Sequence, residues 1–387
     1  MPTRSLAAAA FLAVLSFASS AFATRSSHGA VVKPGGSIQA AVDAANPGDT
    51  ITVLPGTYRE AGTPCPTDPT HTCAVVVTKA NIHLVGLPFG AKRVVLENAG
   101  NQDQGIAIAP TGVDGPTCLA DATTHLAGAS VSGFTVNGFG GEGIFLFCVD
   151  GFSVTFNAAN DNAEYGIFPS HASKGTIALN VVTGSNDTGI YIGQSSNVDV
   201  SNNFVHGNVS GFEIENCSNV RLHDNASTGN TGGILSFTLP FLDVKQNTNN
   251  RIDHNWVQGN NKANTCVDPT DEVCGVPVGT GILALAVDDN RIDHNVVLDN
   301  DSYGIAVANF CLGNKLPSDV CAMLDIDPNP DNNQVDHNAA FGNGKSPSPL
   351  VDPVFGDDLA WDGSGTGNCW SANAFKTSFP EDLPTCP

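Results

Sequence analysis

Short apolar stretches recur along most of this chain at a nearly constant interval, and each of them follows a glycine. The glycine–apolar pairs are Gly143-Ile144, Gly166-Ile167, Gly189-Ile190, Gly211-Phe212, Gly233-Ile234, Gly281-Ile282 and Gly304-Ile305. Successive pairs are 22 or 23 residues apart, except for one step of 48 that holds two units or one unit with an insertion. A fixed period of this length indicates one supersecondary unit stacked on itself rather than a conventional globular core.

Asparagine marks the same period at two further places in each unit. The first set stands 14 residues after a glycine or in the same local context: Asn157, Asn180, Asn203, Asn225, Asn255, Asn295 and Asn338. The second set follows five residues later: Asn162, Asn208, Asn230, Asn260, Asn300 and Asn343. Asparagine tolerates left-handed backbone in turns, and stacked amides can hydrogen-bond to one another. The asparagines therefore predict polar ladders at the turns.

Apolar and polar residues alternate just before these asparagines, as in Val198-Asp199-Val200 and Arg291-Ile292-Asp293. A period of two predicts strands, and the intervals leave no room for crossover helices. We therefore predict an all-β fold, a single-stranded right-handed parallel β-helix (a solenoid) over residues 37–345. A short helix at 37–45 would cap its first coil, and the loop-rich tail 346–387 would cap its last.

The N-terminal segment has the three parts of a secretory signal peptide over residues 1–23. Arg4 precedes an apolar run from Leu6 to Phe17, and Ala21-Phe22-Ala23 offers a cleavage site. Residues 24–36 form a short lead-in. No later stretch is long and apolar enough to suggest a membrane span. These features predict a secreted or periplasmic protein.

All eleven cysteines follow that segment, as expected for an oxidising compartment. Several are close neighbours within irregular insertions near residues 59–73, 111–126, 238–250, 261–280 and 311–331. Insertions of this kind project from one edge of a solenoid and often form the wall of a groove. We expect the disulfides Cys65–Cys73, Cys118–Cys148, Cys266–Cys274, Cys311–Cys321 and Cys369–Cys386, with Cys217 left over.

The formal net charge of −22 limits the choice of partner. Nucleic acid is excluded, because phosphate binding needs a basic surface. A polyanionic glycan would also be repelled unless cations or local basic residues intervene. Calcium stays open as a cofactor, and the sequence does not indicate the oligomeric state.

Two long segments resemble known families. Residues 36–58, from Gly-Ser-Ile-Gln to Pro-Gly-Thr-Tyr, resemble the opening of pectate-lyase-like β-helix proteins. Residues 165–235 resemble a bacterial family of exported parallel β-helix repeat proteins. The resemblance implies the fold over most of the exported chain, leaves the activity open, and is compatible with a polysaccharide partner.

One shorter segment, Glu164 to His171, is similar to the Tyr-Gly-Phe-Asp-Pro-His motif of secreted mannuronan C5-epimerases. In that family the tyrosine, aspartate and histidine abstract and return a sugar proton. Tyr165 matches the tyrosine, but Phe168 stands in place of the aspartate and Ser170 in place of the histidine. His171 comes one position late, which turns a strand residue to the opposite face. The similarity therefore favours a shared fold over the same activity.

The glycine strands should also carry an outward row of acidic and aromatic side chains. If Ile190 and Ile192 face inward, Tyr191 faces outward, and the same register turns Glu213 and Glu215 outward beside it. Leu235, Phe237, Leu283 and Leu285 follow in the same row. Aromatic faces stack on sugar rings, and paired carboxylates perform acid–base chemistry on glycosidic bonds.

The candidate site combines this row with its neighbours. Glu164 and Asp187 occupy the same offset before their glycines, so two carboxylates would meet in adjacent coils and either share a proton or hold a cation. The candidate catalytic residues are Tyr165, His171, Asp187, Glu213 and Glu215. The candidate substrate-binding residues are Phe168, Tyr191, Lys174 and Arg221. The alternative is that these acids are solvated turn residues.

The triplet Asp-His-Asn occurs three times, at residues 253–255, 293–295 and 336–338. Stacking would place three histidines in a column, which a metal could use, but a polar ladder at the asparagine turn explains them more simply. No metal ligand is therefore assigned.

Two classes of function remain. The first is a secreted carbohydrate-active enzyme, either a lyase, an epimerase or a glycosidase. The second is a non-catalytic glycan-binding or structural β-helix protein. No pair of basic residues is clearly placed to hold a uronate carboxylate, and this counts against a lyase.

Overall fold

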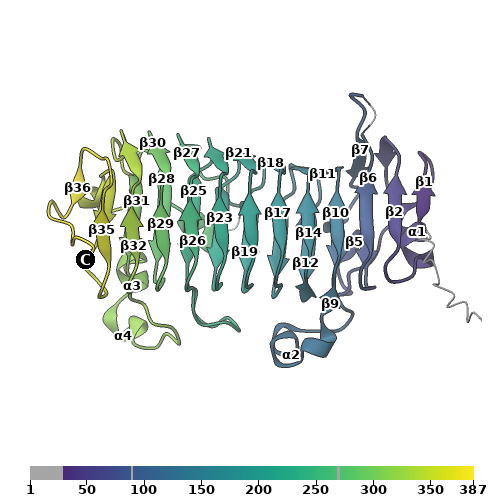
Figure 1. Ribbon diagram of the computed structural model, residues 1–387, viewed down its shortest axis with the longest axis horizontal. Helices are drawn as coiled ribbons and strands as arrows, with labels where there is room; N and C mark the ends of the chain where they lie inside the picture. The colour runs from purple at the N-terminus through teal and green to yellow at the C-terminus, as the bar shows by residue number, and fades with distance from the viewer. Residues whose placement is uncertain (1–28, 89, 268–270) are drawn as a thin grey trace, which may run out of the picture.

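The computed structural model describes residues 29–88, 90–267 and 271–387. The predicted signal peptide, residues 1–23, lies outside the described residues. The described chain winds into a rod of stacked coils, with the N-terminal coils at one end and the C-terminal coils at the other (Figure 1). The predicted all-β, parallel β-helical fold is confirmed.

Three long sheets run the length of the rod, and successive coils contribute one strand to each. Sheet A consists of β1 (Ala30–Val32), β2 (Thr50–Val53), β6 (His83–Gly86), β10 (Ser130–Ser132), β14 (Ser153–Thr155), β17 (Thr176–Ala178), β20 (Asp199–Ser201), β23 (Arg221–His223), β26 (Arg251–Asp253), β29 (Arg291–Asp293), β32 (Gln334–Asp336) and β35 (Cys369–Ser371). Sheet B consists of β3 (Gly56–Tyr58), β7 (Val94–Glu97), β11 (Phe134–Asn137), β15 (Ala158–Asn160), β18 (Val181–Thr183), β21 (Phe204–His206), β24 (Ala226–Thr228), β27 (Trp256–Gln258), β30 (Val296–Leu298) and β33 (Ala339–Phe341).

Sheet C carries the strands that follow the repeated glycines. It consists of β4 (Thr63–Pro64), β5 (Thr72–Val77), β8 (Gln104–Ile108), β12 (Ile144–Phe147), β16 (Ile167–Ser170), β19 (Thr188–Gly193), β22 (Ser210–Glu215), β25 (Gly232–Phe237), β28 (Thr280–Leu285), β31 (Tyr303–Ala308), β34 (Leu359–Trp361) and β36 (Ser378–Phe379). The short strands β9 (Leu126–Ala127) and β13 (Val149–Asp150) pair with each other outside these sheets. Among the named strands, only β4 and β5 pair in antiparallel fashion.

Helices are few and short in the described chain. The α-helices are α1 (Ile38–Ala44), α2 (Gly115–Ala120), α3 (Phe310–Gly313) and α4 (Ser318–Cys321), and the 3-10 turns are η1 (Ala122–Thr124), η2 (Glu272–Gly275) and η3 (Pro353–Phe355). Helix α1 lies at the N-terminal end of the rod, as predicted, and the Ser37 side chain caps it by accepting from the Ala40 amide. Helices α2, α3 and α4 belong to insertions that project from one long edge of the rod (Figure 1).

The repeated glycine is explained by how closely the coils approach at this turn. A Cβ atom on Gly166 would lie 2.2 Å from Val182 Cγ1 and 2.6 Å from the carbonyl oxygen of Gly189 in the next coil. The equivalent position Gly189 would bring its Cβ within 2.9 Å of the Gly211 carbonyl oxygen. Atoms essentially never approach this closely, so any larger residue would push the coils apart. The period in the sequence is therefore a packing requirement.

The interior of the coils is apolar and its turns are held by asparagine ladders. Buried residues such as Ile190, Val200 and Val205 come from all three sheets and join one continuous core. In the first ladder the side-chain oxygen of each asparagine accepts hydrogen bonds from the asparagine of the preceding coil, and Asn225 reaches Asn255 in this way at 3.1 Å. Both ladders predicted from the spacing are confirmed.

The register of sheet C confirms the predicted facing of its strands. Ile190 is opposite Phe212 in the next coil, and both are fully buried in the core. Tyr191 is opposite Glu213, so these two side chains share the outer face of the sheet. Leu235 continues the same outer row.

The loop-rich tail that was predicted to cap the last coil also contributes strands to the sheets. The glycine period ends before residue 346, and the sequence predicts a loop-rich cap beyond it. However, β34 pairs with β31, and β35 pairs with β32, so sheets C and A continue into the tail. The predicted lead-in likewise contains β1, which pairs with β2. Strand pairing needs only extended backbone, and these strands therefore form without the glycine signature.

All five expected disulfides are present: Cys65–Cys73, Cys118–Cys148, Cys266–Cys274, Cys311–Cys321 and Cys369–Cys386. Cys217 is free and buried. Four of the bridges close loops of no more than 17 residues, so they fasten insertions and the tail locally.

Candidate functional site

A cavity of about 750 Å³ lies against the outer face of sheet C. Its floor is formed by outward side chains of β19, β22, β25 and β28, and its walls come from the insertions near residues 238–250, 261–280 and 311–331. The prediction that insertions wall a groove on this structure is therefore confirmed. Two kinds of side chain dominate the lining, namely carboxylates and large apolar groups.

Six carboxylates line the cavity: Glu164, Asp187, Glu213, Glu215, Asp271 and Glu272. Strand β22 supplies Glu213 and Glu215, which are both buried because the insertions cover the face to which they point. Asp187 precedes β19 in the neighbouring coil, where its side chain accepts a hydrogen bond from Thr188 Oγ1 at 2.9 Å. Asp271 and Glu272 are exposed at the cavity wall.

Burial makes the inner carboxylates unusually weak acids. It raises the pKa of Glu213 to about 7, although the hydroxyls of Ser210 and Thr188 act in the opposite direction. Burial also raises the pKa of Glu215 to about 7, against a hydrogen bond from Tyr191, and nearby acids add to the rise.

The third inner carboxylate, Asp187, is shifted in the same direction. Burial and the charge of Glu213 hold the pKa of Asp187 well above its ordinary value. Two interacting buried carboxyls titrate as a pair, because the charge of one makes it harder to ionise the other. Such a pair is suited to general acid–base work near neutral pH.

Aromatic rings continue the acidic row toward the N-terminal coils. The rings of Phe168 and Tyr191 stack with centroids 4.4 Å apart and planes 11° from parallel. Tyr165 contacts both, with centroids at 4.8 and 4.9 Å. Phe145 extends the cluster to the preceding coil at 5.4 Å from Phe168. Gly193 leaves room for the stack, since a Cβ there would lie 3.0 Å from Phe168.

Tyr165 joins the aromatic cluster to the acids. Its hydroxyl hydrogen-bonds to Asp187, which offsets part of the rise in the pKa of that carboxyl. Burial, followed by the charges of Asp187 and Glu213, raises the pKa of Tyr165 far above its ordinary value. The hydroxyl therefore stays protonated and serves as a hydrogen-bond donor in the cavity rather than as a base.

The structure thus brings together most of the predicted site. Tyr165, Asp187, Tyr191, Glu213 and Glu215 all line the cavity. Phe168 supports it from beneath by stacking on Tyr191.

His171 is not part of the cavity lining. It is buried at the far end of β16, where Nε2 lies 3.2 Å from Asp243 Oδ2 and Nδ1 lies 2.9 Å from Ser170 Oγ. The ring also packs against Phe147 at 5.2 Å. Burial lowers the pKa of His171, partly offset by Asp243. The expectation that His171 acts on the same ligand as the acids does not fit this geometry, because the ring is buried against Phe147 and Asp243 and does not line the cavity.

The two predicted basic contacts also lie elsewhere. Arg221 belongs to β23 in sheet A, and its guanidinium forms hydrogen bonds of 2.9 and 2.8 Å with Asp253 of the next coil. Lys174 is exposed at the turn that leads into β17 of sheet A. Both share coils with the site, but a coil passes through three sheets, and these residues lie on another one.

Sequence reasoning missed the residues that come from the insertions. Asp271 and Glu272 lie between Cys266 and Cys274, where no repeat indicates their direction. Glu142 does not line the cavity, but burial and the charge of Glu164 raise its pKa to about 7.

The Asp-His-Asn triplets form the polar ladder rather than a metal centre. The rings of His254, His294 and His337 stack with centroids 4.9 Å apart. Each Nδ1 bonds to the preceding aspartate, which for His294 is Asp293 at 2.8 Å. Parallel stacked rings direct their Nε2 atoms side by side, so these atoms do not converge on one ion.

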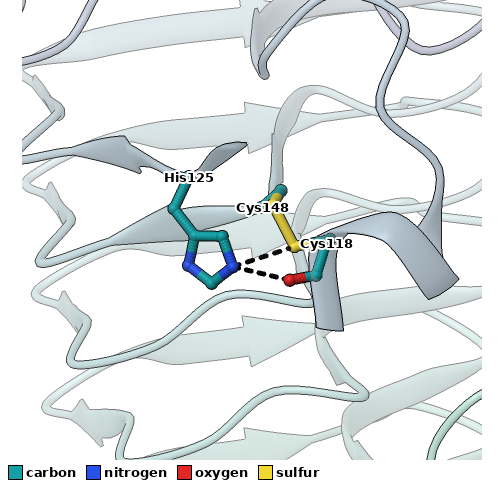
Figure 2. Close-up of side chains that lie close together, drawn as sticks. All are labelled: Cys118, His125 and Cys148. Carbon is teal, nitrogen blue, oxygen red and sulfur yellow. Dashed lines mark hydrogen bonds between the residues drawn. A yellow bond between two sulfur atoms is a disulfide. The ribbon is translucent and has the colours of Figure 1, made fainter. Parts of the chain in front are cut away.

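One other group of potential ligands gathers near α2. Figure 2 shows His125 beside Cys118 and Cys148. However, the two sulfur atoms are joined in a disulfide, which leaves no thiolate for a metal. His125 Nε2 lies 2.8 Å from the Cys118 carbonyl oxygen, and Nδ1 lies 3.0 Å from Asp150. The histidine therefore fastens the α2 insertion to the coil.

Comparisons with known proteins agree with this architecture. The family described as "Right handed beta helix region" matches residues 99–248 and 142–346. No curated protein matches the chain in sequence. In the part of the chain that the structure describes, no helix has the length and apolar character needed to cross a membrane.

Solved structures resemble the fold at low sequence identity. The A-module of mannuronan C-5 epimerase AlgE4 from Azotobacter vinelandii is 16% identical, with a TM-score of 0.58, over 90% of this chain and 95% of that one. The periplasmic alginate epimerase AlgG is 15% identical, with a TM-score of 0.56, over 90% and 77%. A mutant tailspike of the Escherichia coli bacteriophage HK620 is 12% identical, with a TM-score of 0.55, over 88% and 59%. At these identities the likeness concerns the fold.

Proposed function

Since the chain belongs to the family of right-handed β-helix regions, we propose that it is an exported glycan-acting protein whose substrate lies in the acid–aromatic cavity. The observation that carries the proposal is the pair of inner carboxyls, Asp187 and Glu213, beside the stacked rings of Phe168 and Tyr191. Aromatic faces suit the apolar faces of sugar rings, and the cavity has the volume of a small-molecule site.

The chemistry that this arrangement supports is acid–base cleavage of a glycosidic bond. The protonated member of the Asp187–Glu213 pair would give its proton to the glycosidic oxygen as that bond breaks. A water molecule would attack the anomeric carbon and pass a proton to an ionised carboxylate, so the cavity as a whole regains its starting charge. Glu215, which accepts a hydrogen bond from Tyr191, is the third carboxyl in reach of the same space.

Export is part of the proposal. The signal-like segment 1–23 and the five disulfides support a secreted or periplasmic location, because disulfides persist in oxidising compartments. Two of the similar solved proteins are epimerases of alginate or mannuronan by name, and a β-helix is a suitable scaffold for a long polymer. Fractionation of the native host should recover the mature chain, starting near residue 24, outside the cytoplasm.

The test is incubation with a panel of polysaccharides, followed through reducing ends, absorbance of unsaturated uronates and proton NMR. We expect new reducing ends without unsaturated products. Glu213→Gln should lower kcat by about 10²- to 10⁴-fold, which is the usual contribution of a general acid or base. The matched control is Glu381→Gln, an exposed glutamate outside the cavity. Full activity in Glu213→Gln would remove this residue from the mechanism.

A second function is favoured by the apolar part of the lining. Leu235, Phe237 and Leu283 together with the ring cluster would bind a sugar even if no bond were cleaved. Measurable glycan binding with no turnover by any of the three readouts would identify a non-catalytic glycan-binding protein.

A further inference from the structure

We infer that the cavity takes an uncharged glycan and rejects polyuronates. This inference rests on the proposed function and names the substrate class of the same site. It follows from the charges that line the cavity, from the ion pair and hydrogen bonds that hold two nearby lysines, and from the apolar character of the remaining wall.

The lining is acidic and has no counter-charge. Six carboxylates face the space, and among the described lining residues there is no lysine, arginine or histidine. The buried pair Glu213 and Glu215 forms the floor, whereas Asp271 and Glu272 stand exposed at the wall. A polyuronate would therefore meet carboxylates both at the entrance and at the base.

Of the three lysines in the insertions that form the walls, Lys315 is exposed beside the lining residue Asn314 and brings one positive charge against six carboxylates. The other two lysines are held by other groups. Lys245 is paired with Asp325 at 2.6 Å. Lys262 donates to the Gly207 carbonyl oxygen at 2.7 Å and to Thr265 at 3.2 Å. Either side chain would have to leave these partners to neutralise a uronate.

The repulsion is large enough to decide between substrates. Two like charges about 5 Å apart at the edge of a protein repel strongly enough to weaken binding by about a hundredfold, and protonation of some cavity carboxyls reduces this. We therefore expect a uronate to bind at least about tenfold more weakly than its uncharged counterpart.

An uncharged sugar meets no such obstacle. The inner carboxyls can donate hydrogen bonds when protonated and accept them when ionised, and sugar hydroxyls complement both states. Tyr191, which is backed by Phe168, and the neighbouring Leu235 line the cavity and offer a surface for the C–H faces of a pyranose ring. Mannuronan is a polyuronate, and an acidic cavity without basic residues does not suit it.

The experiment uses pairs of hexasaccharides that differ only at C6. Each oligouronate is compared with its carboxyl-reduced form: β-1,4-mannuronate with β-1,4-mannose, α-1,4-galacturonate with α-1,4-galactose, and β-1,4-glucuronate with β-1,4-glucose. Binding is measured by calorimetry with the full mature chain at low and high salt, with EDTA and with added calcium. We expect at least one reduced sugar to bind, and its uronate partner to bind at least about tenfold more weakly in EDTA at low salt.

High salt should reduce the difference in affinity between the uncharged sugar and the uronate. It screens the repulsion between the uronate and the cavity carboxylates and leaves binding of the uncharged sugar unaffected. The double variant Asp271→Asn/Glu272→Gln should also reduce this difference in affinity, because it removes two negative charges from the wall. Both residues are exposed and do not support the coil, so the variant should fold. Preferential binding of a uronate, with or without calcium, would overturn this inference and leave the proposed function standing. Binding of no sugar from any pair would overturn both.

Discussion

Replacing Glu213 with glutamine should make the protein more stable at high pH. Glutamine keeps the shape of the side chain and removes the carboxyl that burial makes reluctant to ionise. In the unfolded chain this carboxyl titrates near its ordinary value, so the two states bind protons differently.

The direction and size of the effect follow from that difference. Below pH 4.5 the carboxyl is protonated in both states. Between pH 4.5 and about 7 the unfolded chain releases its proton first, so folding must take one up and stability falls as pH rises. A pKa raised from 4.5 to about 7 corresponds to about 3 kcal/mol of stability lost across this interval. Above that range the loss is constant.

Urea unfolding of the wild type and Glu213→Gln at pH 4.5 and pH 8 measures this contribution. We expect the variant to lose about 3 kcal/mol less than the wild type between the two values. The remaining decline should come from the other inner carboxyls, since burial also raises the pKa of Glu215. Glu381→Gln, at an exposed position, should follow the wild type. Identical pH dependence in Glu213→Gln and the wild type would show that this carboxyl is not buried as the structure has it.

Three further variants test an asparagine ladder, the aromatic stack and one disulfide. Asn255→Ala removes an amide that bonds to both neighbouring coils, and should lower the free energy of unfolding by about 2 kcal/mol in thermal or urea denaturation. Tyr191→Ala should weaken glycan binding by about tenfold in calorimetry, because it removes half of the stacked pair; unchanged affinity would place the sugar elsewhere. Cys118→Ala/Cys148→Ala opens a link across 30 residues and should cost about 3–4 kcal/mol of stability, whereas an unchanged unfolding midpoint would contradict the expected role of this bridge.

The coil could be predicted from the sequence because each type of repeated residue has one main structural cause. The glycines recur since a Cβ at positions such as Gly166 would strike the next coil. The asparagines recur because each of them, such as Asn225, bonds to its equivalent in the following coil. These are local requirements repeated many times, so the register of β19 against β22, and with it the meeting of Tyr191 and Glu213, could be predicted.

The walls of the site could not be predicted in the same way. Asp271 and Glu272 come from an insertion that has no period, so nothing in the sequence shows that they return to the face of β22. The prediction that the basic residues lie in the site was wrong for a different reason. Arg221 shares a coil with Glu215, but residues only six positions apart lie on different sheets once the chain turns a corner. The repeat period shows which coil a residue belongs to, but it does not show which of the three sheets carries that residue.

The floor and the wall of the cavity therefore have separate roles. Strand β22 is paired with β19 on one side and β25 on the other, so the backbone beneath Glu213 and Glu215 cannot move them apart to relieve their mutual repulsion. Burial, which the insertions provide, is the main cause of their raised pKa, and the charge of Glu272 adds to the rise for Glu215. The wall segment that bears Asp271 and Glu272 is fastened by a disulfide that closes only a short loop, and its described residues form no part of a sheet. The coil therefore fixes where the two carboxyls stand, whereas the insertions determine both their burial and the charge at the entrance.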